Sequence, residues 1–286
     1  MILITGATGQ VGGEVAKQLS GMGIHYRALV RNPEKASTIA ALGAEVVQGD
    51  LEKPETLNAA MRGIEKVFLL SPSGPEQLER EGNATEAAKR AGVKHIIKLS
   101  VFGASPFSPI VLGQWHWYSE KNIEESGIPF TFVRPTLFMQ NFRQFASTIK
   151  TEGKIYAPAG DAKVSFIDAR DIAAVAVAAL TKPGHENKVY EITGPEALSY
   201  DEMAKSFSEA IGKPVAYMNI PPDVTRQAML EVGLPEWLIE DSLYYYEYGR
   251  SGHALTVTHW VGRVAEKQPY MFAAFACDYA AAFMSE

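Results

Sequence analysis

Short runs rich in β-branched residues alternate with longer segments of helical periodicity along most of this chain, and this alternation restricts its fold more than any other feature. Strand–helix alternation implies right-handed crossover connections, which produce a parallel sheet covered by helices on both faces. The expected strands are 2–5, 25–30, 45–48, 66–70, 95–99, 130–133 and 188–194. The expected helices are 10–20, 33–42, 54–61, 75–91 and 114–126. The sequence therefore predicts an α/β fold, a Rossmann-type doubly wound parallel sheet.

The later part of the chain contains two helix-start signals and then changes in character. Asp168 is followed three residues on by Asp171, and Ser199 by Glu202, which is a capping-box pattern. After about residue 194 the alternation gives way to helices rich in Met, Trp and Tyr. The expected units are a Rossmann domain, 1–194 with its sheet core in 1–155, and a smaller, mainly helical C-terminal lobe that covers the substrate, 195–286.

Composition excludes several classes of protein. The net charge of −6 and the lack of a gathered Lys/Arg face argue against a nucleic-acid-binding surface. We see no basic leader followed by a long apolar stretch and no apolar run of about 18 residues, so we expect neither a signal peptide nor a membrane span. The single cysteine, Cys277, allows no intramolecular disulfide and fits a reducing compartment. We expect a cytoplasmic protein, monomer or homodimer.

Three glycines spaced by three residues, Gly6, Gly9 and Gly12, join the first strand to the first helix. In dinucleotide-binding folds such glycines form the tight turn, let the backbone approach a pyrophosphate, and allow close helix–strand packing. The phosphates then lie at the helix N-terminus, where free N–H groups favour an anion. The spacing differs from the usual Gly-x-Gly-x-x-Gly, and a purely structural turn is the alternative. The strand before it and the helix after it favour nucleotide binding.

The end of the second strand distinguishes the two nicotinamide dinucleotides. An NAD site usually has an acidic residue there, whereas this chain has Arg31 and then Lys35. A guanidinium forms charge-assisted hydrogen bonds to a 2′-phosphate, so the position favours NADP(H) over NAD(H), although a solvated basic loop is the alternative. After the third strand, Asp50 is placed either to accept from an adenine amino group or to cap the next helix.

The expected cofactor contacts lie where successive strands end. They are Gly6, Ala7, Thr8, Gly9, Gln10 and Val11 after the first strand, Arg31 and Lys35 after the second, Asp50 and Leu51 after the third, Leu70, Ser71 and Pro72 after the fourth, Ser100 and Val101 after the fifth, and Pro135 at the end of the sixth. No Cys or His cluster has metal-ligand spacing, so no metal is expected.

Several segments resemble the NmrA-like group of atypical short-chain dehydrogenases/reductases, and most closely the type 2 NAD(P)H:quinone oxidoreductases and triphenylmethane reductases. The segments are "TGATGQVGG", "LVRNPEKA", "GVKHIIKLS", "SGIPFTFVRP" and "DARDIAAVA". The resemblance covers about residues 1–195. It implies a Rossmann core, NADPH as the cofactor, and a substrate cleft between two lobes.

The chain departs from typical short-chain dehydrogenases in the helix after the fifth strand. These enzymes use Tyr-x-x-x-Lys there, but Tyr118 is followed four residues on by Asn122, and Lys121 has the wrong spacing. His116 and Glu120 stand at i and i+4 on one helix face and are able to touch. An imidazole that titrates near neutrality is a plausible proton donor, so His116 with Glu120 is the candidate catalytic pair. A structural histidine–carboxylate pair is the alternative.

Three functions remain compatible with the sequence. The first is an NADPH-dependent reductase that transfers hydride to a quinone or a similar conjugated aromatic acceptor, because that chemistry needs no Tyr–Lys pair. The second is an NADP-binding redox sensor without turnover, which signals to a protein partner. The third, a carbonyl reductase or an epimerase-type enzyme, lacks a recognisable proton donor. We favour the first.

A flat aromatic substrate suits the side chains expected near the cleft, because small-molecule pockets are mainly apolar with a few placed polar groups. The expected substrate contacts are Phe102, Trp117, Phe138 and Asn141, and Trp115, Phe107 and Met139 are further candidates for an apolar slot. The backbone after Pro135 is expected to pass the nicotinamide ring. Core packing is the alternative for each aromatic side chain.

Overall fold

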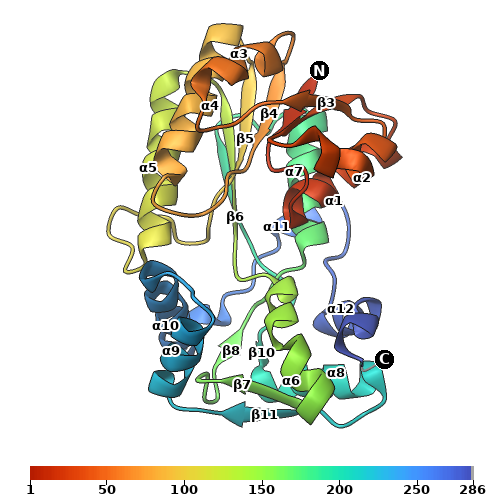
Figure 1. Ribbon diagram of the computed structural model, residues 1–286, viewed down its shortest axis with the longest axis vertical. Helices are drawn as coiled ribbons and strands as arrows, with labels where there is room; N and C mark the ends of the chain where they lie inside the picture. Colours follow the sequence, from red (N-terminus) through yellow and green to blue (C-terminus); the bar gives the residue numbers. More distant parts are fainter. Residues whose placement is uncertain (285–286) are drawn as a thin grey trace.

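The computed structural model describes residues 1–284, apart from the side chain of Lys35, and consists of two lobes joined by several passages of the chain (Figure 1). A seven-stranded parallel sheet runs through the first lobe in the order β3-β2-β1-β4-β5-β6-β9. Its strands are β1 (Ile2–Ile4), β2 (Tyr26–Val30), β3 (Glu45–Gln48), β4 (Lys66–Leu69), β5 (His95–Leu99), β6 (Phe130–Pro135) and β9 (Lys188–Ile192). The strand order reverses between β1 and β4, which is where Rossmann-type sheets bind their ligands.

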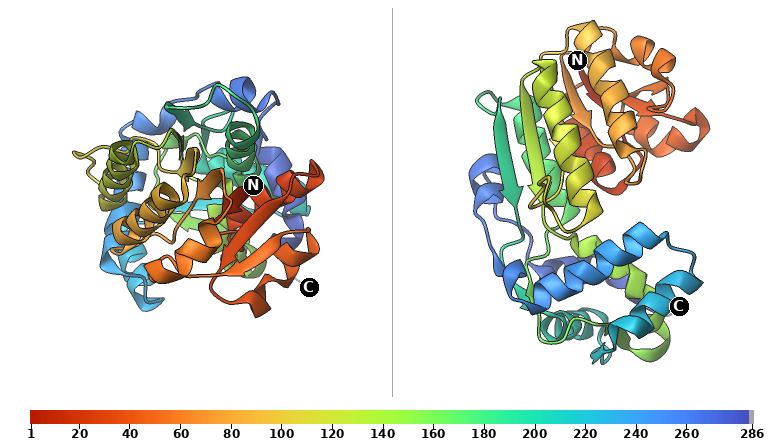
Figure 2. Two further views of the ribbon diagram at one scale, coloured as in Figure 1. Left: turned by 90° about the horizontal axis from the view of Figure 1, so that it is seen from above. Right: turned by 90° about the vertical axis from the view of Figure 1, so that its left-hand side faces the viewer.

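Helices cover both faces of the sheet, as the alternation predicts (Figures 1 and 2). One face carries α1 (Gln10–Gly21), α7 (Ala169–Thr181) and α11 (Trp260–Ala265), and the other carries α3 (Pro54–Met61), α4 (Gln77–Ala91) and α5 (Val111–Ser126). Successive strand residues point to opposite faces, so Ile4 packs in one core and Leu3 in the other. Burial on both faces explains why the central strand β1 is apolar throughout rather than alternating.

The second lobe is built around a separate apolar core rich in phenylalanine, in which Phe142 contacts Phe207 and Phe272. Its elements are η2 (Met139–Phe145), α6 (Ala146–Glu152), β7 (Lys154–Ala157), β8 (Lys163–Val164), β10 (Leu198–Ser199), α8 (Tyr200–Ile211), β11 (Ala216–Asn219), α9 (Pro222–Glu231), α10 (Glu236–Arg250), η3 (His253–Leu255), α12 (Phe272–Asp278) and η4 (Ala280–Phe283). Residues 139–166 contribute to this core, whereas α11 returns to the first lobe. The chain thus crosses between lobes more often than one boundary at residue 194 implies.

The expected strands and helices are present, and their limits differ where contacts distant in sequence decide them. The segment 33–42 divides into η1 (Pro33–Ala36) and α2 (Ser37–Ala41). Helix α5 begins at Val111 instead of residue 114, because Asp241 of α10 accepts hydrogen bonds at 3.0 Å from the N–H groups of Val111 and Leu112. A cap from another element of this kind leaves no signal near the helix start.

One of the two expected capping boxes forms. Ser199 and Glu202 exchange both hydrogen bonds at the start of α8. At the start of α7, Asp168 accepts from the N–H of Arg170, but the carboxylate of Asp171 accepts from Lys267 and from the N–H of Tyr270 instead of turning back to the cap. The second pattern is therefore an N-cap without the reciprocal bond.

Candidate active site

The glycine-rich turn after β1 has the backbone geometry that the dinucleotide interpretation requires. Gly6 has φ +62°, in the left-handed region that favours glycine. A Cβ on Gly12 would lie 2.2 Å from the carbonyl oxygen of Gly6, so only glycine lets α1 pack this closely on the turn. Gly9 caps α1 without a side-chain hydrogen bond, and the first turn carries no acidic residue. The N-terminus of α1 is therefore open to an anion such as pyrophosphate.

The ends of β1 and β4 are tied together beneath this turn. The hydroxyl of Thr5 donates to the carbonyl of Leu70 at 2.7 Å and accepts from the Leu70 N–H at 2.8 Å. Leu70 in turn contacts the position where a Cβ on Gly6 would lie. This link fixes the floor of the crevice at the switch point of the sheet.

Arg31 is exposed at the end of β2, where a 2′-phosphate would lie. Its backbone oxygen accepts from Gln48, and within the described part of the chain its guanidinium has no hydrogen-bond or ion-pair partner. The side chain of Lys35 lies outside the described residues. Asp50 accepts from the N–H of Glu52 in the turn before α3, and Leu51 is buried in the core beneath that helix. The adenine contact predicted for Asp50 remains a prediction.

A cleft of about 580 Å³ lies between the two lobes. Most predicted contacts after the fourth to sixth strands line it, and so do three of the four predicted substrate contacts. These residues are Leu70, Ser71, Ser100, Val101, Pro135, Phe102, Phe138 and Asn141. The second lobe contributes Leu238, Ser242, Tyr244, Tyr245, Tyr248 and His253. The hydroxyl of Ser100 is buried without a hydrogen-bond partner among the described residues, so it is available to a ligand.

Trp117 does not line this cleft, contrary to the sequence prediction. Its ring packs edge-on against Tyr118, with centroids 5.0 Å apart, and Lys121 lies over it. The reason is helical geometry: one residue beyond His116, the side chain has turned about 100° away from the cleft. Trp115 packs instead against Trp237 of α10, where the two lobes meet.

His116 lines the cleft, but Glu120 does not orient it as the sequence predicts. Both carboxylate oxygens of Glu120 accept from Arg134, at 2.9 and 2.5 Å, so its charge is already paired. The Nδ1 atom of His116 lies 2.7 Å from Nζ of Lys98 and 3.1 Å from Nε2 of Gln77. The predicted pair is therefore replaced by contacts from β5 and α4, which only the tertiary fold brings to α5.

Lys98 belongs to a fully buried charged cluster beneath the cleft. Its ammonium lies 3.0 Å from Oε2 of Glu81, and the other oxygen of Glu81 accepts from the hydroxyl of Ser71 at 2.8 Å. Sequence reasoning missed this cluster. Its signal is the lysine itself, since a charged residue between Ile97 and Leu99 in a strand buried on both faces requires a buried partner.

Burial and the nearby cations Lys98 and Arg134 hold the pKa of His116 well below its usual value. The imidazole is therefore neutral near pH 7. Burial likewise raises the pKa of Tyr245, which also lines the cleft, so this phenol stays protonated.

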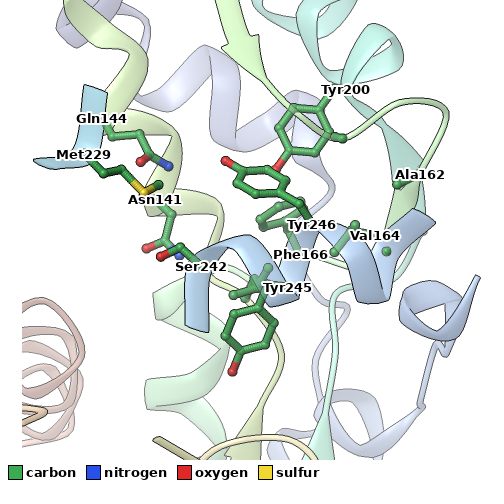
Figure 3. Close-up of a pocket in the computed structure, with 13 residues that line it drawn as sticks. Asn141, Gln144, Ala162, Val164, Phe166, Tyr200, Met229, Ser242, Tyr245 and Tyr246 are labelled. Carbon is green, nitrogen blue, oxygen red and sulfur yellow. The ribbon is translucent and has the colours of Figure 1, made fainter. Parts of the chain in front are cut away.

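A smaller chamber in the second lobe adjoins the cleft. Figure 3 shows the side chains that line the chamber. The two cavities share Leu137, Asn141, Val164, Ser242 and Tyr245. In Figure 3, Asn141 and Ser242 lie together on one side of the chamber, while the rings of Tyr200 and Tyr246 lie next to each other on the other, tilted by 47°. Burial raises the pKa of Tyr246 to about 12, so its hydroxyl also stays protonated. The chamber thus combines aromatic walls with amide and hydroxyl groups.

The described residues offer neither a metal site nor a membrane-spanning helix. Among residues 1–284, no group of three or more His, Cys, Asp or Glu side chains is arranged to hold a metal ion. None of the described helices is both long and apolar enough to cross a membrane. His253 also lines the cleft, and its ring stacks on Tyr248.

Fold and site together define a Rossmann-type protein with a glycine-rich turn and a cleft between two lobes. The chain belongs to the NmrA-like family, whose sequence profile matches residues 1–267. It is 44% identical over 283 residues to an NAD(P)H azoreductase of Xenophilus azovorans, and the match covers 99% of each protein. The family resemblance drawn from the sequence is therefore confirmed.

Two solved structures share the whole architecture. The NADPH complex of an NADPH-dependent quinone oxidoreductase from Escherichia coli is 32% identical, with a TM-score of 0.86 over 97% of this chain and 99% of that one. The NADP(H) complex of a triphenylmethane reductase from Citrobacter sp. is 30% identical, with a TM-score of 0.86 over 98% of this chain and 100% of that one. The predicted Rossmann-type fold is confirmed.

Proposed function

We propose that this protein is an NADPH-dependent reductase that transfers hydride to a quinone or a similar conjugated aromatic acceptor. The relatives support NAD(P)H-dependent oxidoreductase activity, because the azoreductase, the quinone oxidoreductase and the triphenylmethane reductase all match nearly the full chain. The choice of acceptor goes beyond those names and rests on the cleft itself.

The observation that carries the proposal is the composition of the cleft where β5 and β6 end. Ser100, Val101 and Pro135 border it on the side where a nicotinamide bound to a Rossmann fold lies. Apolar and aromatic side chains from both lobes, with hydroxyl, amide and imidazole groups between them, form the remaining wall. A bound nicotinamide supplies the hydride, and the protein then needs to bind, orient and shield a flat acceptor.

The chain's own residues divide this work between them. The turn at Gly6, Gly9 and Gly12 and the N-terminus of α1 fit the pyrophosphate, and Arg31 is placed for the 2′-phosphate. The unpartnered hydroxyl of Ser100 is available to the nicotinamide end. His116 presents a neutral imidazole to the acceptor.

The chamber in the second lobe favours acceptors larger than a single ring. Its aromatic walls continue those of the cleft, and Asn141 and Ser242 stand at the junction. An acceptor with two aromatic groups is able to place the reacting bond in the cleft and the second group in the chamber. We expect such acceptors to have a higher kcat/KM than one-ring quinones.

The first experiment follows NADPH oxidation by absorbance with a panel of one-ring quinones, two-ring quinones and azo compounds. NADH runs in parallel, and calorimetry measures binding of both dinucleotides. Turnover with NADPH and a preference for two-ring acceptors support the proposal. Tight NADPH binding without turnover on any acceptor contradicts it and favours the redox sensor, whose protein partner becomes the next target.

The cellular setting is part of the same proposal. The single cysteine, Cys277, is exposed and unpaired, which fits a reducing compartment such as the cytoplasm. Fractionation of the producing cells tests the compartment. Light scattering of the purified protein distinguishes a monomer from a homodimer.

A further inference from the structure

A lysine without solvent exposure lies directly beneath the cleft. Lys98 is the last but one residue of β5, and its Nζ contacts Nδ1 of His116 at 2.7 Å, Oε2 of Glu81 at 3.0 Å and the carbonyl of Leu99 at 3.1 Å. Burying an ammonium and a carboxylate is costly, and apolar residues of the same volume often serve folding equally well. Packing alone therefore does not explain the buried Lys98–Glu81 pair.

We propose that Lys98 is a positioning residue that holds His116 as a neutral imidazole with its proton on Nε2, so that this N–H donates into the cleft. The recipient is the acceptor oxygen or nitrogen on which negative charge develops. The inference rests on the proposed reductase function for its consequence, but not for its geometry.

Hydrogen-bond chemistry leaves one arrangement of the ring. An ammonium donates and never accepts, so the Nδ1 atom beside Lys98 has to be the acceptor. The amide nitrogen of Gln77, 3.1 Å from the same Nδ1, is also only a donor. The proton of the neutral ring is therefore on Nε2, and among the described residues no protein group takes up that N–H.

Burial is the main reason that His116 is neutral, and charged groups from four elements surround its ring. Lys98 of β5 and Arg134 of β6 are cationic, and both disfavour an imidazolium. Glu81 of α4 and Glu120 of α5 are anionic, but each is already paired with one of these cations. His116 is thus close to two cations, and the carboxylate that pairs with each cation is not a hydrogen-bond partner of its ring.

This arrangement suits the reduction of a conjugated acceptor. A hydride brings two electrons and one proton, and leaves a negative charge on the far heteroatom of the acceptor. The Nε2–H of His116 stabilises that charge by a hydrogen bond, and the Lys98 ammonium strengthens the donor by polarising the ring. The second proton comes from water, so His116 keeps its own.

A double variant separates positioning from folding. Lys98→Met alone would leave the Glu81 carboxylate buried and unpaired, so we combine it with Glu81→Gln, which retains an oxygen for the Ser71 hydroxyl. Lys121→Met is the control, because Lys121 lies on the same helix as His116 and pairs with Glu124 at the surface. Thermal unfolding verifies that the wild type, the double variant and Lys121→Met are all folded.

The first readout is the ¹⁵N NMR spectrum of the histidine rings, with His116→Gln used for assignment, in protein without cofactor. We expect the wild type and Lys121→Met to show His116 with its proton on Nε2 near pH 7. In the double variant we expect the imidazole to titrate closer to its usual value of about 6.5. A wild-type ring protonated on Nδ1, or a titration unchanged in the double variant, overturns the proposal.

The second readout is steady-state kinetics with the best acceptor of the panel. We expect kcat to fall about 10- to 100-fold in the double variant, with KM for the acceptor changed little, because the lost interaction belongs to the transition state. The pH profile should gain an inflection near the new pKa of His116. An unchanged kcat and pH profile contradict the role of Lys98. Absence of turnover in the wild type contradicts the reductase function instead, while the NMR result still decides the tautomer.

Discussion

Two regions of the candidate site, the glycine-rich turn and the cluster around His116, are built in opposite ways. The glycine-rich turn after β1 is made of backbone, and Gly6, Gly9 and Gly12 come from seven consecutive residues. The cluster around His116 is made of side chains from the β4–α4 connection, α4, β5 and α5. The shape of the first region depends on the absence of side chains at its glycines. The arrangement of the second depends on which side chains hydrogen-bond or pair with one another. Mutations should therefore affect the two regions in different ways.

The largest effect is expected in the backbone-built region. Gly12→Ala places a Cβ 2.2 Å from the Gly6 carbonyl, and the turn has to move. We expect NADPH binding about 100-fold weaker, from roughly 3 kcal/mol of overpacking, as measured by calorimetry. Gly13→Ala is the matched control, since its Cβ would meet its nearest neighbour at an ordinary 3.6 Å. Equal binding by both variants would contradict a turn that requires glycine.

A second prediction concerns the proposed role of Arg31, whose side chain lies at the end of β2. Arg31→Ala removes the guanidinium placed for the 2′-phosphate, and we expect the Kd of NADPH to rise about 10- to 100-fold. NADH lacks that phosphate, so its Kd should stay within about twofold. The two titrations on one protein sample serve as each other's control. Equal weakening of both dinucleotides would exclude Arg31 from discrimination between them.

The chamber in the second lobe is likewise lined by side chains, and we expect their size to decide which acceptors enter it. Met229→Trp narrows the chamber, and we expect kcat/KM for two-ring acceptors to fall about tenfold while one-ring quinones are unaffected. Met218→Trp, at an exposed position on β11, is the control. A uniform loss with both classes of acceptor would mean that the chamber does not receive the second ring.

The smallest effect concerns stability against acid. The folded-state pKa of His116 lies below that of the unfolded chain, so acidification through about pH 6.5 protonates only the unfolded chain and lowers the free energy of unfolding. His116→Gln should reduce this slope by up to about 1.4 kcal/mol per pH unit. Urea unfolding at pH 7.5 and 5.5 measures it. The remaining slope belongs in part to His95 and His185, whose pKa values burial also lowers.

Elements of the sheet were predictable because their signals are local. Apolar strands, the glycine spacing and the Ser199–Glu202 capping box each lie within a few consecutive residues. The predicted contacts after the fourth to sixth strands line the cleft for a related reason: parallel strands bring their carboxyl ends to one edge. Predictions failed where the partner lies far away in sequence, as for Glu120, which pairs with Arg134 of the neighbouring strand.

The sequence by itself determined the Rossmann-type fold and the glycine turn at its switch point. Each follows from backbone conformation or periodicity, which neighbouring residues specify. Only the tertiary structure decided that His116 faces the cleft with Lys98 at its Nδ1, and that Trp117 turns away from it. Those outcomes depend on how β5, α4 and α5 pack, because a buried charge takes the partner that packing places beside it.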